Sequence, residues 1–218
     1  MTIKINQINL NYEVHGEGKP LIFLHGNGES LNIFRGVIPL LENKFKMYLI
    51  DSRCHGKSDD TKDITYELMR DDIIAFIKAL NISKPLIYGF SDGGIIALEI
   101  AIKEPKLLSK IIISGPNLNP RGFKLLMRLY VNLGYLFTQN KLFKLMKEEP
   151  NISLKELQKI VIPTVILAGS KDIIKKKHLE AIKSNIANAK LKIINGETHT
   201  SYVHNSTKLV SLIKEYLN

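Results

Sequence analysis

The chain has 218 residues, of which 44% are hydrophobic and 24% charged, and its formal net charge at pH 7 is +10. This composition is typical of one folded domain and excludes a disordered or fibrous chain. The single cysteine, Cys54, excludes an internal disulfide and a multi-cysteine metal site. No apolar run approaches the roughly 20 residues of a membrane span, and the first residues lack the apolar segment of a signal peptide, so we expect a cytoplasmic protein.

The predicted strands fall into two groups. Ile3–Ile8 and Leu10–Val14 alternate apolar and polar residues, which is typical of half-buried antiparallel strands. Six later segments are short and almost uninterrupted apolar runs: Leu21–Leu24, Lys46–Ile50, Pro85–Tyr88, Lys110–Ile113, Val165–Ala168 and Leu191–Ile194. Strands that are apolar on successive residues are buried on both faces, as in a mainly parallel sheet.

Amphipathic helices are predicted between and after these strands, at Ile64–Leu80, Ile95–Lys103, Lys176–Ile186 and Ser206–Leu217. Alternation of strands and helices predicts right-handed crossover connections. We therefore expect residues 1–218 to form one α/β domain. Its centre is a doubly wound, mainly parallel eight-stranded sheet with helices on both faces.

One segment, about residues 117–160, interrupts this alternation. It has no strand pattern, and it is too long and too rich in large apolar side chains for an exposed loop. We interpret it as a small helical insertion, a lid above the sheet whose apolar face covers a pocket. Because this lid is short, we expect an accessible or shallow pocket.

The strongest functional signal is the sequence Gly89-Phe90-Ser91-Asp92-Gly93-Gly94. It lies between a predicted strand and a predicted helix, which is the context that gives the G-x-S-x-G pattern its meaning. A serine at such a turn adopts a strained backbone and projects its hydroxyl away from the sheet. Gly89 and Gly93 permit that turn because they carry no side chain. We therefore predict Ser91 as a nucleophile.

A serine nucleophile needs a base, and the base needs a carboxylate that orients it. Hydrolases with this turn present the acid and then the histidine on loops after later strands. Asp172 follows the strand Val165–Ala168, whereas the loop after Ile113 offers no carboxylate in Ser114–Asn117. His199 lies in the loop after the last predicted strand, whereas His204 falls at or inside the final helix. We therefore predict Asp172 as the acid and His199 as the base.

Acyl transfer also needs hydrogen-bond donors for the oxyanion. The backbone N–H of Asp92, the residue after the nucleophile, is one candidate. The loop that begins His25-Gly26-Asn27 follows the strand Leu21–Leu24, and its glycines permit close approach to a substrate. We predict the backbone N–H of Asn27 as the second donor.

These motifs together resemble the α/β-hydrolase superfamily along essentially the full chain. The resemblance rests on His25-Gly26, the segment Asp51–Ser58, the turn Gly89–Gly94, the segment Gly169–Asp172 and His199. The chain departs from the family pattern in two places. Cys54 stands where the family usually has a glycine, and Glu197-Thr198 precede His199 where small residues are more usual.

The resemblance implies a two-step acyl transfer without a metal or another cofactor, because the turn Gly89–Gly94 carries a serine. We expect a carboxylesterase that acts on a small to medium apolar substrate through an acyl-enzyme. Thioesters, lactones and carbon–carbon bonds next to a ketone remain alternative substrates. A ligand-binding, receptor-like member with little or no turnover is an alternative of another class.

The excess of basic residues raises the question of an acidic partner. Lysines are scattered along the chain, so we interpret them as a solvated surface, and we expect no nucleic-acid partner. Within the predicted lid, basic residues interleave with apolar ones: Arg121, Lys124, Arg128, Lys141, Lys144 and Lys147. This pattern fits an anionic membrane surface, although we favour a lid over the pocket. We expect a monomer or a homodimer.

Overall fold

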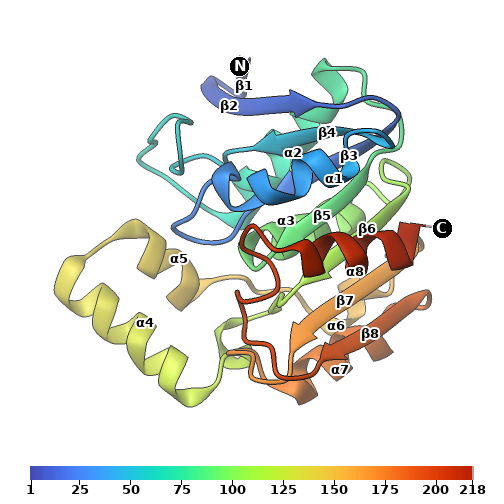
Figure 1. Cartoon of the computed structure of the whole chain (residues 1–218). Coiled ribbons are helices and arrows are strands. Elements are labelled where there is room, and N and C mark those ends of the chain that lie inside the picture. The colour runs from blue at the N-terminus through green and yellow to red at the C-terminus, as the bar shows by residue number, and fades with distance from the viewer. Residues whose placement is uncertain (218) are drawn as a thin grey trace.

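The structure is a computed structural model that describes residues 1–217. Within these residues, eight strands form one sheet in the order β1-β2-β4-β3-β5-β6-β7-β8 (Figure 1). The strands are β1 (Thr2–Ile5), β2 (Ile8–His15), β3 (Lys19–Leu24), β4 (Phe45–Ile50), β5 (Leu86–Phe90), β6 (Lys110–Ser114), β7 (Thr164–Gly169) and β8 (Ala189–Ile194). β1 and β2 pair antiparallel with their neighbours, and the strands from β4 to β8 in this order pair in parallel.

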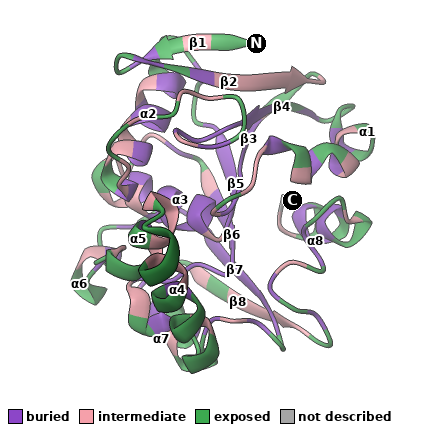
Figure 2. Cartoon of the chain, turned by 90° about the vertical axis from the view of Figure 1, so that its left-hand side faces the viewer, coloured by how far each residue is buried: buried purple, intermediate pink, exposed green. Residues whose placement is uncertain are grey.

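Helices cover both faces of this sheet (Figure 2). The longer ones are α2 (Tyr66–Ala79), α3 (Asp92–Lys103), α7 (Lys176–Ser184) and α8 (Thr207–Leu217). In β3, Ile22 and Leu24 belong to a core cluster that also contains residues of α2, α3 and α7, whereas Leu21 and Phe23 belong to the cluster on the other face, which contains residues of α8. Successive strand residues point to opposite faces, so the unbroken apolar runs are explained by two covered faces. The predicted fold class is confirmed.

Two local differences from the sequence-based prediction have simple causes. The N-terminal hairpin turns at Asn6 and Gln7, which both have positive φ, so β2 begins at Ile8. A 3₁₀-helix, η1 (Leu31–Val37), and a short helix, α1 (Ile38–Leu41), were not predicted. They bury Leu31, Phe34, Val37 and Leu41 at near-helical spacing, and this pattern could have indicated them.

The segment between β6 and β7 contains only helices and connections. These helices are η2 (Pro120–Gly122), α4 (Leu125–Thr138), α5 (Lys141–Glu148) and α6 (Leu154–Leu157). In Figure 1, α4 and α5 form a helical pair that projects from one side of the molecule, beyond the ends of the parallel strands. No helix in residues 1–217 is long and apolar enough to cross a membrane.

Candidate active site

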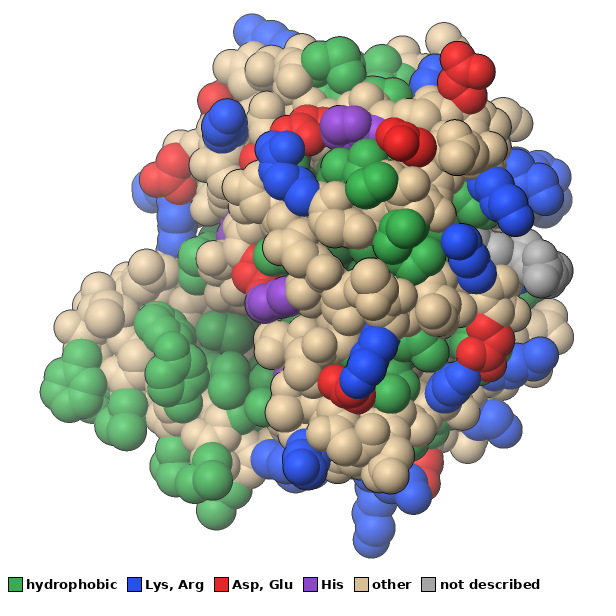
Figure 3. Space-filling view, viewed as in Figure 1, with side chains coloured by type: hydrophobic (Ala, Val, Ile, Leu, Met, Phe, Trp, Pro, Cys, Tyr) green, Lys and Arg blue, Asp and Glu red, His purple; other side chains and the backbone are tan. Residues whose placement is uncertain are grey.

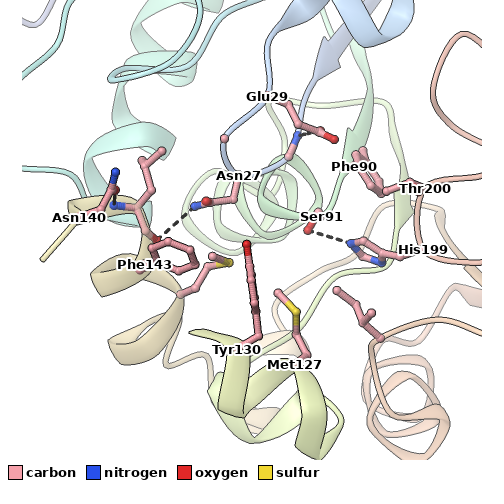
Figure 4. A pocket seen from close by; sticks show the side chains of 15 residues that line it. Asn27, Glu29, Phe90, Ser91, Met127, Tyr130, Asn140, Phe143, His199 and Thr200 are labelled. Carbon is pink, nitrogen blue, oxygen red and sulfur yellow. Dashed lines mark hydrogen bonds between the residues drawn. The ribbon is translucent and has the colours of Figure 1, made fainter. Parts of the chain in front are cut away.

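The predicted site residues lie on separate loops at one edge of the sheet. Ser91 follows β5, Asp172 follows β7, and His199 lies in the connection between β8 and α8. These loops meet because the carboxyl ends of parallel strands share one edge of the sheet. Figure 4 shows Ser91 and His199 facing each other beside a pocket.

The backbone at Ser91 is strained, with φ of 51° and ψ of −111°. This conformation is rare for a residue with a side chain, and it is held by the tight packing of the turn. A Cβ on Gly89 would lie 2.2 Å from the Gly93 carbonyl oxygen, and a Cβ on Gly93 would lie 2.1 Å from the Leu24 carbonyl oxygen. Both positions therefore require glycine, and the turn aims the Ser91 hydroxyl into the pocket.

Ser91, His199 and Asp172 form a continuous hydrogen-bonded chain. The Ser91 hydroxyl lies 3.1 Å from His199 Nε2, and His199 Nδ1 lies 2.8 Å from Asp172 Oδ1. Asp172 is 2% exposed and also accepts a hydrogen bond from the backbone N–H of Ile174. An ionised carboxylate accepts a hydrogen bond from the Nδ1–H group, so the proton stays on Nδ1 and the Nε2 lone pair faces the serine hydroxyl. This arrangement can remove the hydroxyl proton when the serine attacks.

Two neighbours fix the orientation of the His199 ring. The ring of Phe90 packs against it, with 4.9 Å between the ring centroids. Gly115, directly after β6, also lies close to the ring, since a Cβ on it would come within 2.5 Å of His199 Cε1. The sequence analysis did not identify a role for Gly115. Its position and positive φ show why the loop after β6 contains a glycine there.

The two predicted oxyanion donors belong to the two segments next to Ser91, the start of α3 and the loop after β3. Asp92 is the first residue of α3, so its backbone N–H has no acceptor within the helix. Asn27 lies in the loop after β3, and Gly26 in that loop approaches Ser91 so closely that a Cβ would be 3.1 Å from Ser91 Cβ. In residues 1–217, the Asn27 backbone N–H donates to no protein acceptor. Both N–H groups are thus available to a ligand.

A buried hydrogen-bond network links the two donor segments. Asn27 Nδ2 donates to Asp92 Oδ2 over 3.0 Å, and the Tyr66 hydroxyl donates to Asp92 Oδ1 over 2.7 Å. Burial raises the pKa of the Asp92 carboxyl, and its bonds to Tyr66 and Asn27 act in the opposite direction. Tyr66 is the first residue of α2 and was not identified from the sequence, because the two residues are far apart along the chain.

Glu29 is a half-buried carboxyl that the sequence analysis did not identify. Its Oε2 accepts the Gly26 backbone N–H at 2.9 Å, and its Oε1 lies 2.6 Å from His204 Nε2. Burial raises the pKa of Glu29, while His204 and the Gly26 N–H oppose that rise. His204 precedes α8 rather than lying inside it, and it is paired with Glu29 rather than with Ser91. Glu29 therefore holds the loop after β3 through the Gly26 backbone, and Asp92 holds it through the Asn27 side chain.

His25 and the segment Asp51–Ser58 hold the base of the loop after β3 in place. His25 is 1% exposed, and its Nε2 accepts the Ser52 backbone N–H at 3.0 Å. Asp51 accepts from the backbone N–H groups of Leu31 and Lys57. Cys54 has a φ of 62°, which explains why glycine is usual at this position. These residues hold backbone segments in place and do not line the pocket.

The pocket beside Ser91 has a volume of about 330 Å³. Its walls are mainly apolar, with side chains from α4, α5 and the loop after β7: Met127, Tyr130, Leu142, Phe143, Met146 and Ile173. Asn27, Glu29, Asn140 and Thr200 supply polar groups at its edge (Figure 4). Such a pocket suits a substrate with an apolar part next to the reacting group. Among residues 1–217, no group of three or more His, Cys, Asp or Glu side chains is placed to hold a metal ion.

The helices between β6 and β7 cover the pocket only in part. Met127 and Tyr130 of α4 line the pocket, as expected for a lid. However, most large apolar side chains of α4 point to solvent, and Leu126 and Phe137 are 81% and 79% exposed. The expectation that the apolar face covers the pocket is therefore correct for one edge of α4 only.

Comparison with known proteins agrees with the fold and the motifs. Residues 19–140 match the family described as the alpha/beta hydrolase fold, which is more than half of the chain. The chain belongs to this family of hydrolases.

Three similar proteins illustrate the range of the family. "sn-1-specific diacylglycerol lipase ABHD11" of Danio rerio is 33% identical over 111 residues, which are 49% of this chain and 35% of the lipase. The chain thus spans about a third of that lipase. A "putative esterase/lipase" of Haemophilus influenzae is 26% identical and covers 96% of this chain and 88% of its own. The structure of Est816, described as an N-acyl homoserine lactone degrading enzyme, has a TM-score of 0.83 at 19% identity, with both chains fully covered.

Proposed function

We propose that this protein is a serine hydrolase that cleaves a carboxylic ester through an acyl-enzyme. The observation that carries the proposal is the chain of two short contacts from Ser91 through His199 to Asp172, with Ser91 and His199 lining a mainly apolar pocket. In the proposed mechanism, His199 takes the Ser91 proton while Ser91 Oγ attacks the carbonyl carbon. The backbone N–H groups of Asn27 and Asp92 stabilise the resulting oxyanion.

The second half of the reaction uses the same groups. The imidazolium of His199 donates its proton to the leaving alcohol, and the acyl group stays on Ser91. Water then enters, His199 takes a proton from it, and the hydroxide attacks the acyl carbon. Collapse of the second oxyanion releases the carboxylic acid and returns the proton to Ser91 Oγ.

The walls of the pocket favour a small to medium apolar substrate. Its volume of about 330 Å³ lies at the lower end of the range for ligand pockets, roughly 300–1,000 Å³. The carbonyl is positioned between Ser91 and the oxyanion donors, and the apolar part of the substrate lies against Met127, Tyr130 and Phe143. Thioesters, lactones and carbon–carbon bonds next to a ketone remain alternatives, since relatives in this family act on different bonds.

A labelling experiment tests the nucleophile directly. Wild-type protein and the Ser91→Ala variant are incubated with a fluorophosphonate probe, and the labelled residue is identified by mass spectrometry. Ser109→Ala is the matched control, because Ser109 is exposed and precedes β6 at the opposite edge of the sheet. We expect wild type and Ser109→Ala to be labelled at Ser91 and Ser91→Ala to remain unlabelled. Folded wild-type protein without any label would instead support a ligand-binding protein without turnover.

A substrate panel then distinguishes the reactions. Nitrophenyl esters of increasing acyl length are compared with a thioester, a lactone, an amide and a substrate with a cleavable carbon–carbon bond. We expect esters of short to medium acyl chains to give the highest kcat/KM, and Ser91→Ala to lower it by about 10⁴-fold or more. A higher kcat/KM for another bond type would replace the ester proposal while leaving the triad in place.

A further inference from the structure

Helix α4 presents an unusually large apolar surface to solvent. Seven of its 14 residues are large, apolar and exposed: Leu125, Leu126, Leu129, Tyr130, Leu133, Leu136 and Phe137. At roughly 100° per residue, these side chains share an arc of about 140° around the helix axis. Figure 3 shows the corresponding cluster of hydrophobic side chains on the lobe formed by α4 and α5. We call this surface the α4 apolar face.

The opposite side of α4 is already occupied by the protein. Gly134 packs against the ring of Phe143 on α5, and Val131 is 2% exposed. Lys147 on α5 lies over the ring of Tyr135, with 4.5 Å between its Nζ and the ring centroid. Rotation of α4 toward the body of the protein would break these contacts. The α4 apolar face is therefore held outward.

The charged residues of α4 and of the loop before it are basic, whereas α5 ends at the exposed Glu148. Residues 121–147 contain six basic residues and no Asp or Glu. Lys124, Arg128, Lys144 and Lys147 are exposed. Lys124 precedes the first turn of α4, and Arg128 lies beside the apolar arc at helical spacing. An apolar stripe flanked by basic side chains is the pattern of helices that lie in the interface of an anionic bilayer.

The α4 apolar face also meets the pocket. Tyr130 belongs to both, because it is 59% exposed and lines the cavity next to Ser91. Met127 lines the cavity one turn of the helix earlier. A surface that covers α4 therefore lies directly beside the pocket opening.

We propose that the α4 apolar face docks the protein on the surface of an anionic phospholipid bilayer. The apolar side chains enter the boundary between headgroups and acyl chains, and Lys124 and Arg128 contact the anionic headgroups. A second copy of the chain is a poorer fit, since each copy has a net charge of +10 and pairing would bring two basic rims together. Docking depends on the outer face of α4 and not on hydrolysis, so it is tested in the Ser91→Ala protein.

The absence of tryptophan from the sequence allows a site-specific reporter. Phe137→Trp places the only indole on the α4 apolar face, and Val161→Trp places it on an exposed residue near the start of β7, at the opposite edge of the sheet. With vesicles of phosphatidylcholine and phosphatidylglycerol, we expect a blue shift of the Phe137→Trp emission and none for Val161→Trp. A blue shift in neither variant, or an equal shift in both, would overturn the proposal.

Co-sedimentation with the same vesicles measures separately what the apolar and the basic side chains contribute to binding. Leu126→Ser combined with Leu133→Ser should lower the partition coefficient about tenfold or more, whereas the control pair Leu154→Ser with Val161→Ser should not change it. Lys124→Gln with Arg128→Gln should lower it about tenfold and reduce its dependence on salt. Circular dichroism of each variant verifies that the fold is retained.

Two results would assign the face to something else. Equal binding to pure phosphatidylcholine vesicles would show that anionic headgroups are not required, which contradicts the charge argument. A dimer in analytical ultracentrifugation that Leu126→Ser with Leu133→Ser dissociates, together with no vesicle binding, would identify a second copy as the occupant. Neither result depends on whether the wild-type protein hydrolyses esters.

Discussion

The side chain of Asn27 donates a hydrogen bond to the buried carboxyl of Asp92 over 3.0 Å. This bond joins the loop after β3 to the first residue of α3, and each of these segments presents a backbone N–H beside Ser91. The geometry of the proposed oxyanion site therefore depends on a side-chain contact between its two halves. Tyr66 holds the other oxygen of Asp92 and keeps the carboxyl in place.

Removal of the hydrogen bond between Asn27 and Asp92 should destabilise the transition state more than the complex with bound substrate. We expect Asn27→Ala to lower kcat about tenfold with a smaller change in KM, because the loop is less well positioned when charge develops on the oxyanion. The measurement is steady-state kinetics on the best ester of the panel. Asn32→Ala is the control, since Asn32 is exposed and only accepts a bond from Arg35. A change confined to KM would contradict this role for the Asn27 side chain.

The acid of the proposed triad can be tested by an isosteric change. In Asp172→Asn the amide can donate to His199 Nδ1, which moves the ring proton to Nε2 and leaves no lone pair facing Ser91. We expect kcat to fall by about 10³-fold or more while the protein stays folded. Asp63→Asn, an exposed aspartate away from the triad, is the control. Retention of more than a tenth of the wild-type kcat would show that Asp172 does not orient the base.

The free energy of unfolding should decrease as the pH is lowered, because of His25. Burial and the nearby His55 lower the pKa of His25 from 6.5 to about 4, and its Nε2 already accepts the Ser52 N–H. Between pH 6.5 and 4, His25 is protonated in the unfolded chain but remains neutral in the folded protein. The free energy of unfolding therefore decreases as the pH falls from 6.5 to 4. The full contribution is about 3 kcal/mol, present above pH 6.5.

Urea denaturation at several pH values between 4 and 7.5 measures this dependence. In His25→Gln the amide oxygen can still accept the Ser52 N–H but does not titrate. We expect the variant to be less stable at neutral pH, with a flatter slope through the same window. An identical slope in wild type and variant would assign the acid sensitivity to other groups.

The ion pair between Arg53 and Asp72 should be a major determinant of stability. Arg53 Nε and Nη2 donate to the two oxygens of Asp72 over 2.6 and 2.7 Å, and both side chains are buried. Because Asp72→Asn leaves a buried guanidinium without its counter-charge, we expect a loss of about 3 kcal/mol in the free energy of unfolding.

An exposed ion pair provides the comparison. Lys78 Nζ lies 2.9 Å from Glu104 Oε1, and the two side chains are 58% and 40% exposed. We expect Glu104→Gln to change the free energy of unfolding by less than about 1 kcal/mol. Both values come from chemical denaturation at pH 7. Equal losses in the two variants would mean that burial does not determine the strength of these pairs.

The sequence indicated the elements of the fold well where local chemistry decides them. Unbroken apolar runs predicted the parallel strands, because a strand covered on both faces needs apolar residues at every position. α3 begins at Asp92, three residues earlier than predicted, because Ser91 itself forms the start of the helix. The glycines and the serine in the turn indicated its strained backbone conformation. They did not indicate the residue at which the helix begins.

The contacts around the loop after β3 could not be predicted in this way. Glu29 with His204, and Tyr66 with Asp92, join residues that are distant along the chain and carry no spacing signal. An isolated sequence does not specify which polar groups meet in a buried region. Only the packing of α2 beside α3, and the position of the segment before α8, bring them together.

By itself, the sequence determined the class of sheet, the turn at Ser91, and the loops that carry Ser91, Asp172 and His199, because each depends on residues within one strand and the loop that follows it. The tertiary structure alone decided which side of α4 faces the pocket. Hydrophobic periodicity defines an apolar face of a helix but not what that face contacts. Since α5 occupies one side of α4, Met127 and Tyr130 line the pocket of Ser91 while Leu126 and Phe137 remain in solvent.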